Sequence, residues 1–168
     1  VCVRPVGRLD KETSGIVLFA KNQVAAQRLQ EQRAKGLLEK QYLAITEGKL
    51  PIDQNSDWHT IDCPIRKTGN HPLRMEAIKN INMSAMGQSV CENSMDNVGY
   101  LHAVTHYRVL DSTDEWSVVN LKLDTGRTHQ IRVHMLSIGH PLLGDSLYNR
   151  SLDKKELYSI NRAALHAW

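Results

Sequence analysis

The sequence predicts an α+β domain with a largely antiparallel sheet. Three observations carry this prediction: strand-like alternation recurs in several short segments, two of these segments are joined by a turn-rich linker, and only two stretches have helical spacing. Runs of strands with few helices, rather than strict strand–helix alternation, are typical of the α+β class. With 168 residues and 41% hydrophobic content, the chain can bury a core as one compact domain.

The first elements are expected to be a strand and a helix. The apolar run 16–20 predicts a short buried strand. Asn22 suits the N-cap of a helix that continues to about Lys35, and Gly36 is well placed to end that helix.

Further strands are expected at residues 40–47, 58–65, 103–110 and 117–123. The first of these places Tyr42 and Ala44 on one face, and the second is broken at Pro64. The last two are joined by a turn-rich linker that favours a hairpin. Residues 79–99 have no clean period and predict an excursion loop.

A second helix is expected after Gly126. Thr128 can cap it, and Gly139 followed by Pro141 marks its end. Apolar residues recur at helical spacing at Ile131, Met135 and Ile138. The other side of this helix carries Arg127, Gln130 and His134, with Arg132 displaced toward its edge.

Basic residues are concentrated toward the two ends of the chain. Residues 1–50 contain nine basic and five acidic residues (net +4), and residues 121–168 contain seven and four (net +3). The middle contains five and nine (net −4). This distribution is typical of a site that faces a phosphate backbone, although surface charge also varies in this way by chance.

Cysteine content and hydropathy indicate the compartment. Cys2, Cys63 and Cys91 show no paired spacing, which predicts reduced thiols. No apolar run reaches the roughly 20 residues that span a bilayer, and no charged-then-apolar leader is present. We therefore expect a cytoplasmic monomer that does not bind membranes. Both ends look like interiors of elements, so residues 1–168 are expected to form a single domain truncated at both ends.

Asp10 lies in a polar turn that follows Arg8 and leads into residues 13–15. An Asp in such a loop most often bonds only to nearby backbone donors. An arginine aligned with the carboxylate would instead keep it ionised and oriented, because an opposite charge within roughly 4–6 Å favours the charged form. Such a carboxylate can act as a nucleophile or stabilise charge on an electron-poor sugar carbon.

The segment 125–134, with the sequence TGRTHQIRVH, has three interpretations. A zinc site is disfavoured because His129 and His134 are five residues apart and no cysteine pair is near. A solvated helix face is the second, and the crowding of donors near a helix start weakens it. We favour the third, in which backbone N–H groups and Arg127 meet phosphate while another arginine meets a carboxylate.

Tyr42 also has two interpretations. A tyrosine on a strand most often packs in the core or against a neighbouring strand. Beside Lys40, in a protein that binds nucleic acid, it could stack on a base, which is worth about 1–3 kcal/mol per base.

Three segments resemble the signature segments of the RluA-type RNA pseudouridine synthases. They are residues 8–15 (RLDKETSG), 40–44 (KQYLA) and 125–145, which begins TGRTHQIRVH and ends GD. The strand pattern at 103–107 and the closing LHA at 165–167 fit as well, so the similarity spans nearly the whole chain. It implies an α+β fold with a mixed, mostly antiparallel central sheet, flanking helices and an active-site cleft.

The resemblance also implies an enzyme without cofactor or metal that isomerises uridine to pseudouridine in ribosomal RNA, above all of the large subunit, or in transfer RNA. The catalytic residues would be Asp10, Tyr42 and Arg132. Asp10 would be the catalytic aspartate, Tyr42 would stack on the target base and assist proton removal from it, and Arg132 would pair with Asp10. The carboxylate would either add to the first carbon of the sugar or remove a proton from the second. The residues expected to contact RNA are Arg8, which would enter the space left by the flipped nucleotide, Thr13, Lys40, Arg127, His129 and Gln130.

Two other classes of function remain open. The first is a non-catalytic protein that binds or folds RNA on the same scaffold, and the second is a metal-dependent hydrolase that uses the histidines. Gly7 stands where the family commonly has a histidine, which leaves the subfamily and its substrate open.

Overall fold

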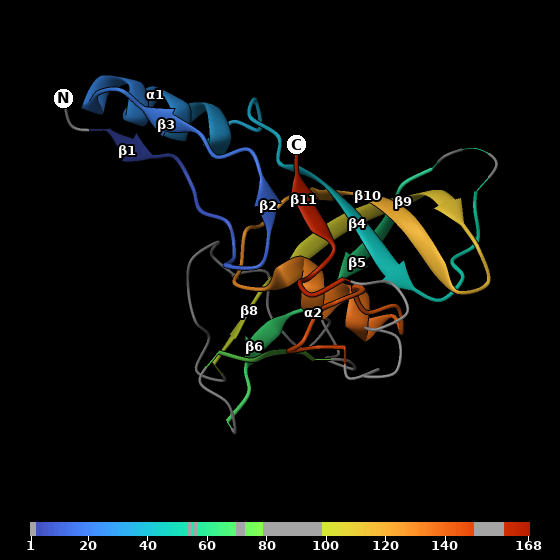
Figure 1. Ribbon diagram of the computed structural model, residues 1–168. Helices are drawn as coiled ribbons and strands as arrows, with labels where there is room; N and C mark the ends of the chain where they lie inside the picture. The colour runs from blue at the N-terminus through green and yellow to red at the C-terminus, as the bar shows by residue number, and fades with distance from the viewer. Residues whose placement is uncertain (1–2, 54, 56, 70–72, 79–98, 150–159) are drawn as a thin grey trace.

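The computed structural model describes residues 3–53, 55, 57–69, 73–78, 99–149 and 160–168. In chain order its elements are β1 (Arg4–Pro5), β2 (Ser14–Gly15), β3 (Phe19–Ala20), α1 (Gln23–Ala34), β4 (Gln41–Glu47), β5 (His59–Asp62), β6 (Ile65–Lys67), β7 (Met75–Ala77), β8 (Tyr100–Leu101), β9 (Val104–Ser112), β10 (Trp116–Leu123), α2 (Gln130–Ser137) and β11 (Leu165–Ala167). Figure 1 shows α1, β1 and β3 grouped at one end of the molecule, beyond β2 and β11.

The central sheet has six strands in the order β2-β11-β4-β10-β9-β5. A three-stranded sheet, β7-β6-β8, and a two-stranded pair, β1-β3, accompany it. Every strand pair is antiparallel except β11 and β2, which run parallel. The predicted α+β class with a mixed, mostly antiparallel sheet is therefore confirmed.

The main core lies between one face of the central sheet and α2. Burial alternates along β4, so that Tyr42, Ala44 and Thr46 are buried and the residues between them are partly exposed. On β10 the buried Val119 and Leu121 belong to the same cluster, as do Ile131 and Met135 of α2 and other buried residues of the sheet. The alternation predicted for residues 40–47 is confirmed, and the buried face of β4 is the one that carries Tyr42.

The hairpin and the break between two strands also agree with the sequence. β9 and β10 are neighbouring antiparallel strands, as the turn-rich linker predicted. The predicted strand 58–65 is divided at Cys63 and Pro64 into β5 and β6, which belong to different sheets. Residues 79–98 of the predicted excursion loop lie outside the described residues, as do Cys2 and Cys91. The thiol of Cys63 donates to the carbonyl of Ile78 at 3.3 Å.

The prediction of a buried strand over residues 16–20 was wrong. Only the last two of these residues form a strand, β3, and Ile16 and Phe19 are 64% and 58% exposed. The physical reason is that β3 pairs only with the two-residue β1, in a small sheet of its own. α1 contacts β3, but it leaves Ile16 and Phe19 exposed. Ala20 alone of the five is buried.

Both helices end as predicted, but only the first begins as predicted. The side chain of Asn22 accepts a hydrogen bond from the backbone N–H of Ala25 at 2.8 Å, as an N-cap does. α2 begins one residue later than expected, because its N-cap is His129 in the left-handed conformation (φ 56°) without a side-chain cap bond. Gly36 and Gly139, both with positive φ, follow the two helix ends. No helix in the described part of the chain is long and apolar enough to cross a membrane.

Candidate active site

A pocket of about 430 Å³ lies where the segment between β1 and β2 meets β4 and the start of α2. Its lining comes from the chain after β1 (Pro5, Gly7, Arg8, Leu9, Asp10, Thr13), from α1 (Arg33), from β4 and the residue before it (Tyr42, Lys40), from β10 and the segment up to α2 (Leu123, Gly126, Arg127, Thr128), from α2 (Gln130, Ile131, Arg132) and from β11 (Leu165). All the predicted site residues except His129 therefore line one pocket.

The turn that carries Asp10 is fixed to β11. The backbone N–H of Thr13 donates to the carbonyl of Asp10 at 3.0 Å and closes the turn. Two residues later Gly15 lies against β11 with φ 125°, and a Cβ at this position would overlap the carbonyl oxygen of Ala167. The next N–H, of Ile16, donates to that same carbonyl at 3.0 Å. The Thr-Ser-Gly step therefore allows a close approach that holds the aspartate turn at the pocket.

Tyr42 contributes a buried phenol to the pocket wall. Burial, and then the negative charge of Asp10, raise the pKa of Tyr42, while Arg33 opposes this. The phenol therefore keeps its proton at neutral pH. Asp10 and Tyr42 both line the pocket.

Arg132 pairs with a different acid from the one expected. Its Nε and Nη2 donate to the two carboxylate oxygens of Asp145 at 2.7 and 2.6 Å, and Nη2 lies 3.6 Å from Oε2 of Glu12. Within the described residues, Asp10 forms no ion pair with Arg132. The expected contact is replaced because Asp145, 13 residues further on, presents both oxygens to the same edge of the guanidinium.

The charge on Arg132 is stabilised by three acids together. Burial alone would lower its pKa, but the hydrogen bonds and charge of Asp145, then Glu12 and Asp10, raise the pKa of Arg132 above its usual value. The guanidinium carbon also lies 5.0 Å from the ring centre of Tyr148. Asp10 is thus within electrostatic reach of Arg132 although the two side chains form no ion pair.

Sequence reasoning missed three of these residues: Glu12, Asp145 and Tyr148. Two of them belong to segments that the sequence singled out, because Glu12 lies two residues after Asp10 and Asp145 closes the third signature segment. A lone buried Arg needs an acidic partner, and that requirement was the signal that could have pointed to Asp145.

His129 lies behind the pocket wall. Its Nδ1 is 2.9 Å from the hydroxyl of Tyr148. Burial and the charge of Arg132 lower the pKa of His129, and the three nearby carboxylates oppose this. A half-buried imidazole in contact with a tyrosine is placed to support the Arg132 cluster, whereas the sequence predicted that it contacts RNA.

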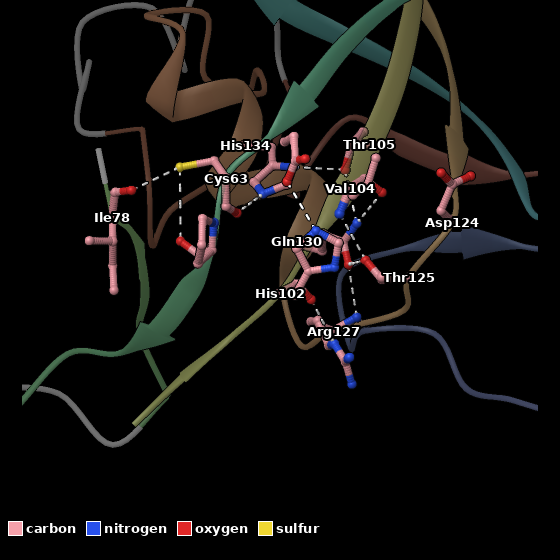
Figure 2. A network of polar contacts seen from close by, with 12 residues as sticks. Cys63, Ile78, His102, Val104, Thr105, Asp124, Thr125, Arg127, Gln130 and His134 are labelled. Carbon is pink, nitrogen blue, oxygen red and sulfur yellow. Dashed lines mark hydrogen bonds and ion pairs between the residues drawn. The ribbon is translucent and has the colours of Figure 1, made fainter. Parts of the chain in front are cut away.

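Gln130 is committed to hydrogen bonds inside the protein (Figure 2). Its Oε1 accepts from the hydroxyl of Thr125 at 2.7 Å and from the N–H of Arg127 at 3.0 Å. Its Nε2 donates to the carbonyl of Val104 at 2.8 Å and to the hydroxyl of Thr105 at 3.0 Å. A glutamine amide has two acceptor and two donor positions, so these four bonds use all of them. Gln130 therefore fixes the segment that carries Arg127, and the prediction that it contacts RNA is not supported.

The same network continues to the buried His134 (Figure 2). Nδ1 of His134 lies 2.8 Å from the hydroxyl of Thr105, and Nε2 lies 2.9 Å from the carbonyl of Cys63. Because a carbonyl can only accept, Nε2 carries the proton and Nδ1 accepts from Thr105. This chain of bonds ties α2 to β9 and to the segment between β5 and β6.

Four cationic side chains besides Arg132 line the pocket: Arg8, Arg33, Lys40 and Arg127. Nη2 of Arg8 donates to the hydroxyl of Thr128 at 3.2 Å, and Nε of Arg127 donates to the carbonyl of His102 at 3.1 Å. Among the residues with described positions, no group of three or more His, Cys, Asp or Glu side chains could hold a metal ion. The arrangement thus places a carboxylate and a phenol in a pocket whose cationic lining attracts anions.

Comparison with known proteins gives a consistent result. Residues 2–137 match the family model described as RNA pseudouridylate synthase. The chain is 42% identical over 167 residues to the uncharacterized RNA pseudouridine synthase YhcT of Bacillus subtilis (98% of this chain, 46% of that protein). It is 37% identical over 167 residues to the ribosomal large subunit pseudouridine synthase D of Nitrosomonas europaea (97% and 42%).

A solved structure agrees with these matches. The structure of human RNA pseudouridylate synthase domain containing 1 superposes with a TM-score of 0.73 and 30% identity, covering 99% of this chain and 62% of that one. The chain spans about half the length of the curated relatives it matches. Since the family model covers most of the chain and the fold agrees, the chain belongs to the RNA pseudouridylate synthase family.

Proposed function

We propose that the full-length protein isomerises uridine to pseudouridine in RNA and that Asp10 is its catalytic carboxylate. The observation that carries this proposal is the pocket that Asp10, Tyr42 and Arg132 line together with four further cationic side chains. Family membership supports it, because the relatives are named as pseudouridine synthases.

The reaction explains why one carboxylate is enough. The bond between C1′ of the ribose and N1 of uracil breaks, the base turns, and C1′ joins to C5. C5 then loses its proton and N1 gains one, so atoms balance without a co-reactant. No water has to be activated, and therefore no second carboxylate is required as in glycoside hydrolysis. Asp10 would either add to C1′ or take a proton from C2′.

The remaining pocket residues serve the nucleotide. A uridine in a stack must be extruded at a cost of a few kcal/mol, and stacking on Tyr42 would return about 1–3 kcal/mol. Arg8 would enter the space left by the nucleotide, and Lys40 and Arg127 would meet the backbone. Thr13, at the end of the aspartate turn, lines the same recess.

We propose ribosomal RNA of the large subunit as the substrate class, because a relative 37% identical to this chain is named for that activity. Transfer RNA is the alternative that the experiment must include. The cytoplasmic location, the monomeric state and the absence of a cofactor and of a metal stay predictions from the sequence.

The test is chemical mapping of pseudouridine after incubation of the full-length protein with unmodified ribosomal and transfer RNA transcripts. We expect pseudouridine at a discrete site with the unaltered protein and none with Asp10→Asn. If the unaltered protein forms no pseudouridine in any of these RNAs, the proposal fails. If Asp10→Ala keeps the biological role in cells, the protein acts by binding or folding RNA instead.

A further inference from the structure

Two cations converge on one side of the pocket without an acidic partner. Arg33 lies in the last turn of α1, and Lys40 directly precedes β4. A Cβ added at Gly126, in the connection between β10 and α2, would stand 3.1 Å from Nη2 of Arg33 and 3.3 Å from Nζ of Lys40. Both positive groups, from the end of α1 and the residue before β4, therefore reach the same small volume beside Gly126, which is far from them in the sequence.

Asp10 lines the same pocket, but it forms no ion pair with either cation in the described part of the chain. None of the ion pairs between described residues includes Arg33 or Lys40. The nearest acids in the sequence are committed elsewhere: Glu39 pairs with Lys122 at 3.3 Å, and Glu31 accepts a hydrogen bond from within α1. Two like charges therefore lie near the same point without an ion-pair partner among the described residues.

This arrangement costs free energy in the absence of a ligand. Burial, and then the charge of Arg33, lower the pKa of Lys40. An anion between the two groups would offset both effects, because an opposite charge favours the protonated amine. The missing side chain of Gly126 leaves the space for it open, since a Cβ would crowd Nη2 of Arg33.

We propose that Arg33, Lys40 and the backbone at Gly126 form a subsite for one phosphodiester of the RNA strand, next to the nucleotide whose base stacks on Tyr42. Lys40 and Tyr42 are two residues apart and both line the pocket, so their side chains leave the same face of the chain about 7 Å apart. That separation is comparable to the length of one nucleotide. The inference rests on the proposed function, and it assigns a role to Arg33, which the sequence did not single out.

The test measures binding separately from catalysis. The full-length protein is titrated with a labelled uridine pentaribonucleotide, and with two versions in which one linkage beside the central uridine is an uncharged methylphosphonate. The variant is Arg33→Gln, which has nearly the same helix propensity as the original. The matched control is Arg28→Gln, since Arg28 is an exposed residue of the same helix that does not line the pocket.

We expect Arg33→Gln to raise Kd about tenfold, as loss of a charge-assisted hydrogen bond does, and to reduce the slope of log Kd against log salt by about 0.7 to 1. Arg28→Gln should change Kd by no more than about twofold and leave the salt slope nearly unaltered. One methylphosphonate should weaken binding to the unaltered protein by about the same factor, yet add little further loss in Arg33→Gln. Arg33→Lys should restore most of the affinity.

Two results overturn the subsite. One is an Arg33→Gln protein that matches the Arg28→Gln control in both Kd and salt slope. The other is a loss from the methylphosphonate that is the same in Arg33→Gln as in the unaltered protein, because Arg33 then meets no phosphate. Failure of the proposed function is a separate outcome, since it appears as absence of pseudouridine in the mapping experiment whatever the binding data show.

Discussion

Replacing Asp145 with asparagine should destabilise this domain more than removing the charge of Glu12, the other acid near Arg132. Both partners of the pair are buried: the side chain of Arg132 is 5% exposed and that of Asp145 is 0% exposed. In Asp145→Asn the amide keeps one acceptor oxygen, but it sets an N–H group against the N–H groups of Arg132. The guanidinium would then remain buried with its main counter-charge removed.

The size of the effect follows from what remains around Arg132. Removing one partner of a buried pair typically costs about 3–5 kcal/mol. Glu12, 3.6 Å from Nη2, and the ring of Tyr148, 5.0 Å from the guanidinium carbon, still offset part of the charge. We therefore expect the lower end, about 3 kcal/mol, which corresponds to a fall in Tm of roughly 6–12 °C for a domain of this size.

Thermal unfolding followed by circular dichroism measures this fall, with Glu12→Gln as the control. Glu12 is about a third exposed and lies further from Arg132, so its replacement should cost less than about 1 kcal/mol. Equal falls in Tm for the two variants would refute this prediction, because burial of the pair between Arg132 and Asp145 would then contribute no additional stability. Well below Tm, Asp145→Asn should also lower kcat, since Arg132 loses its fixed orientation.

Three further predictions concern the scaffold of the site. Gly15→Ala should lower Tm and activity together, because a Cβ there would overlap the carbonyl of Ala167; an unchanged protein would contradict the close approach of β2 and β11. Gln130→Leu should cost about 2–4 kcal/mol in urea unfolding, because several buried partners lose their bonds, whereas a cost near zero would show that the network is dispensable. Burial lowers the pKa of His134, so the unfolded state binds its proton first; stability should be full above about pH 6.5 and fall as pH drops through that value toward the lowered pKa. Urea midpoints between pH 7.5 and 5 should show this slope, and His134→Gln should flatten it.

Local sequence patterns predicted those elements in which burial alternates regularly from residue to residue, such as β4. The alternation of residues 41–47 specifies a buried face because β4 is a central strand with neighbours on both sides, β11 and β10. The run 16–20 is equally apolar, yet it lies beside a two-residue strand in a small sheet of its own. Hydrophobicity shows that a segment can be buried, whereas the layer that covers it is decided by the tertiary fold, which the local pattern does not contain.

The site was predictable as a set of residue types but not as a set of pairs. Asp10, Tyr42 and Arg132 do line one pocket. Two acids, Asp10 and Asp145, were available to Arg132, and spacing in the sequence could not decide between them. The approach of Arg33 to Gly126 depends on where α1 lies relative to α2, which no local pattern records.

The pairing of Arg132 with Asp145 affects how Asp10 can act. A carboxylate held by two guanidinium hydrogen bonds has its lone pairs occupied and its basicity reduced, which would hinder addition to C1′ and proton removal from C2′ alike. Because Asp145 takes both Nε and Nη2, Asp10 is left within electrostatic reach of Arg132 but in no ion pair with a described residue. Under the proposed function, its oxygens then remain available to the nucleotide. On this reasoning Asp145 fixes the arginine so that Asp10, the carboxylate proposed to be catalytic, need not. This is why loss of Asp145 should reduce kcat as well as stability.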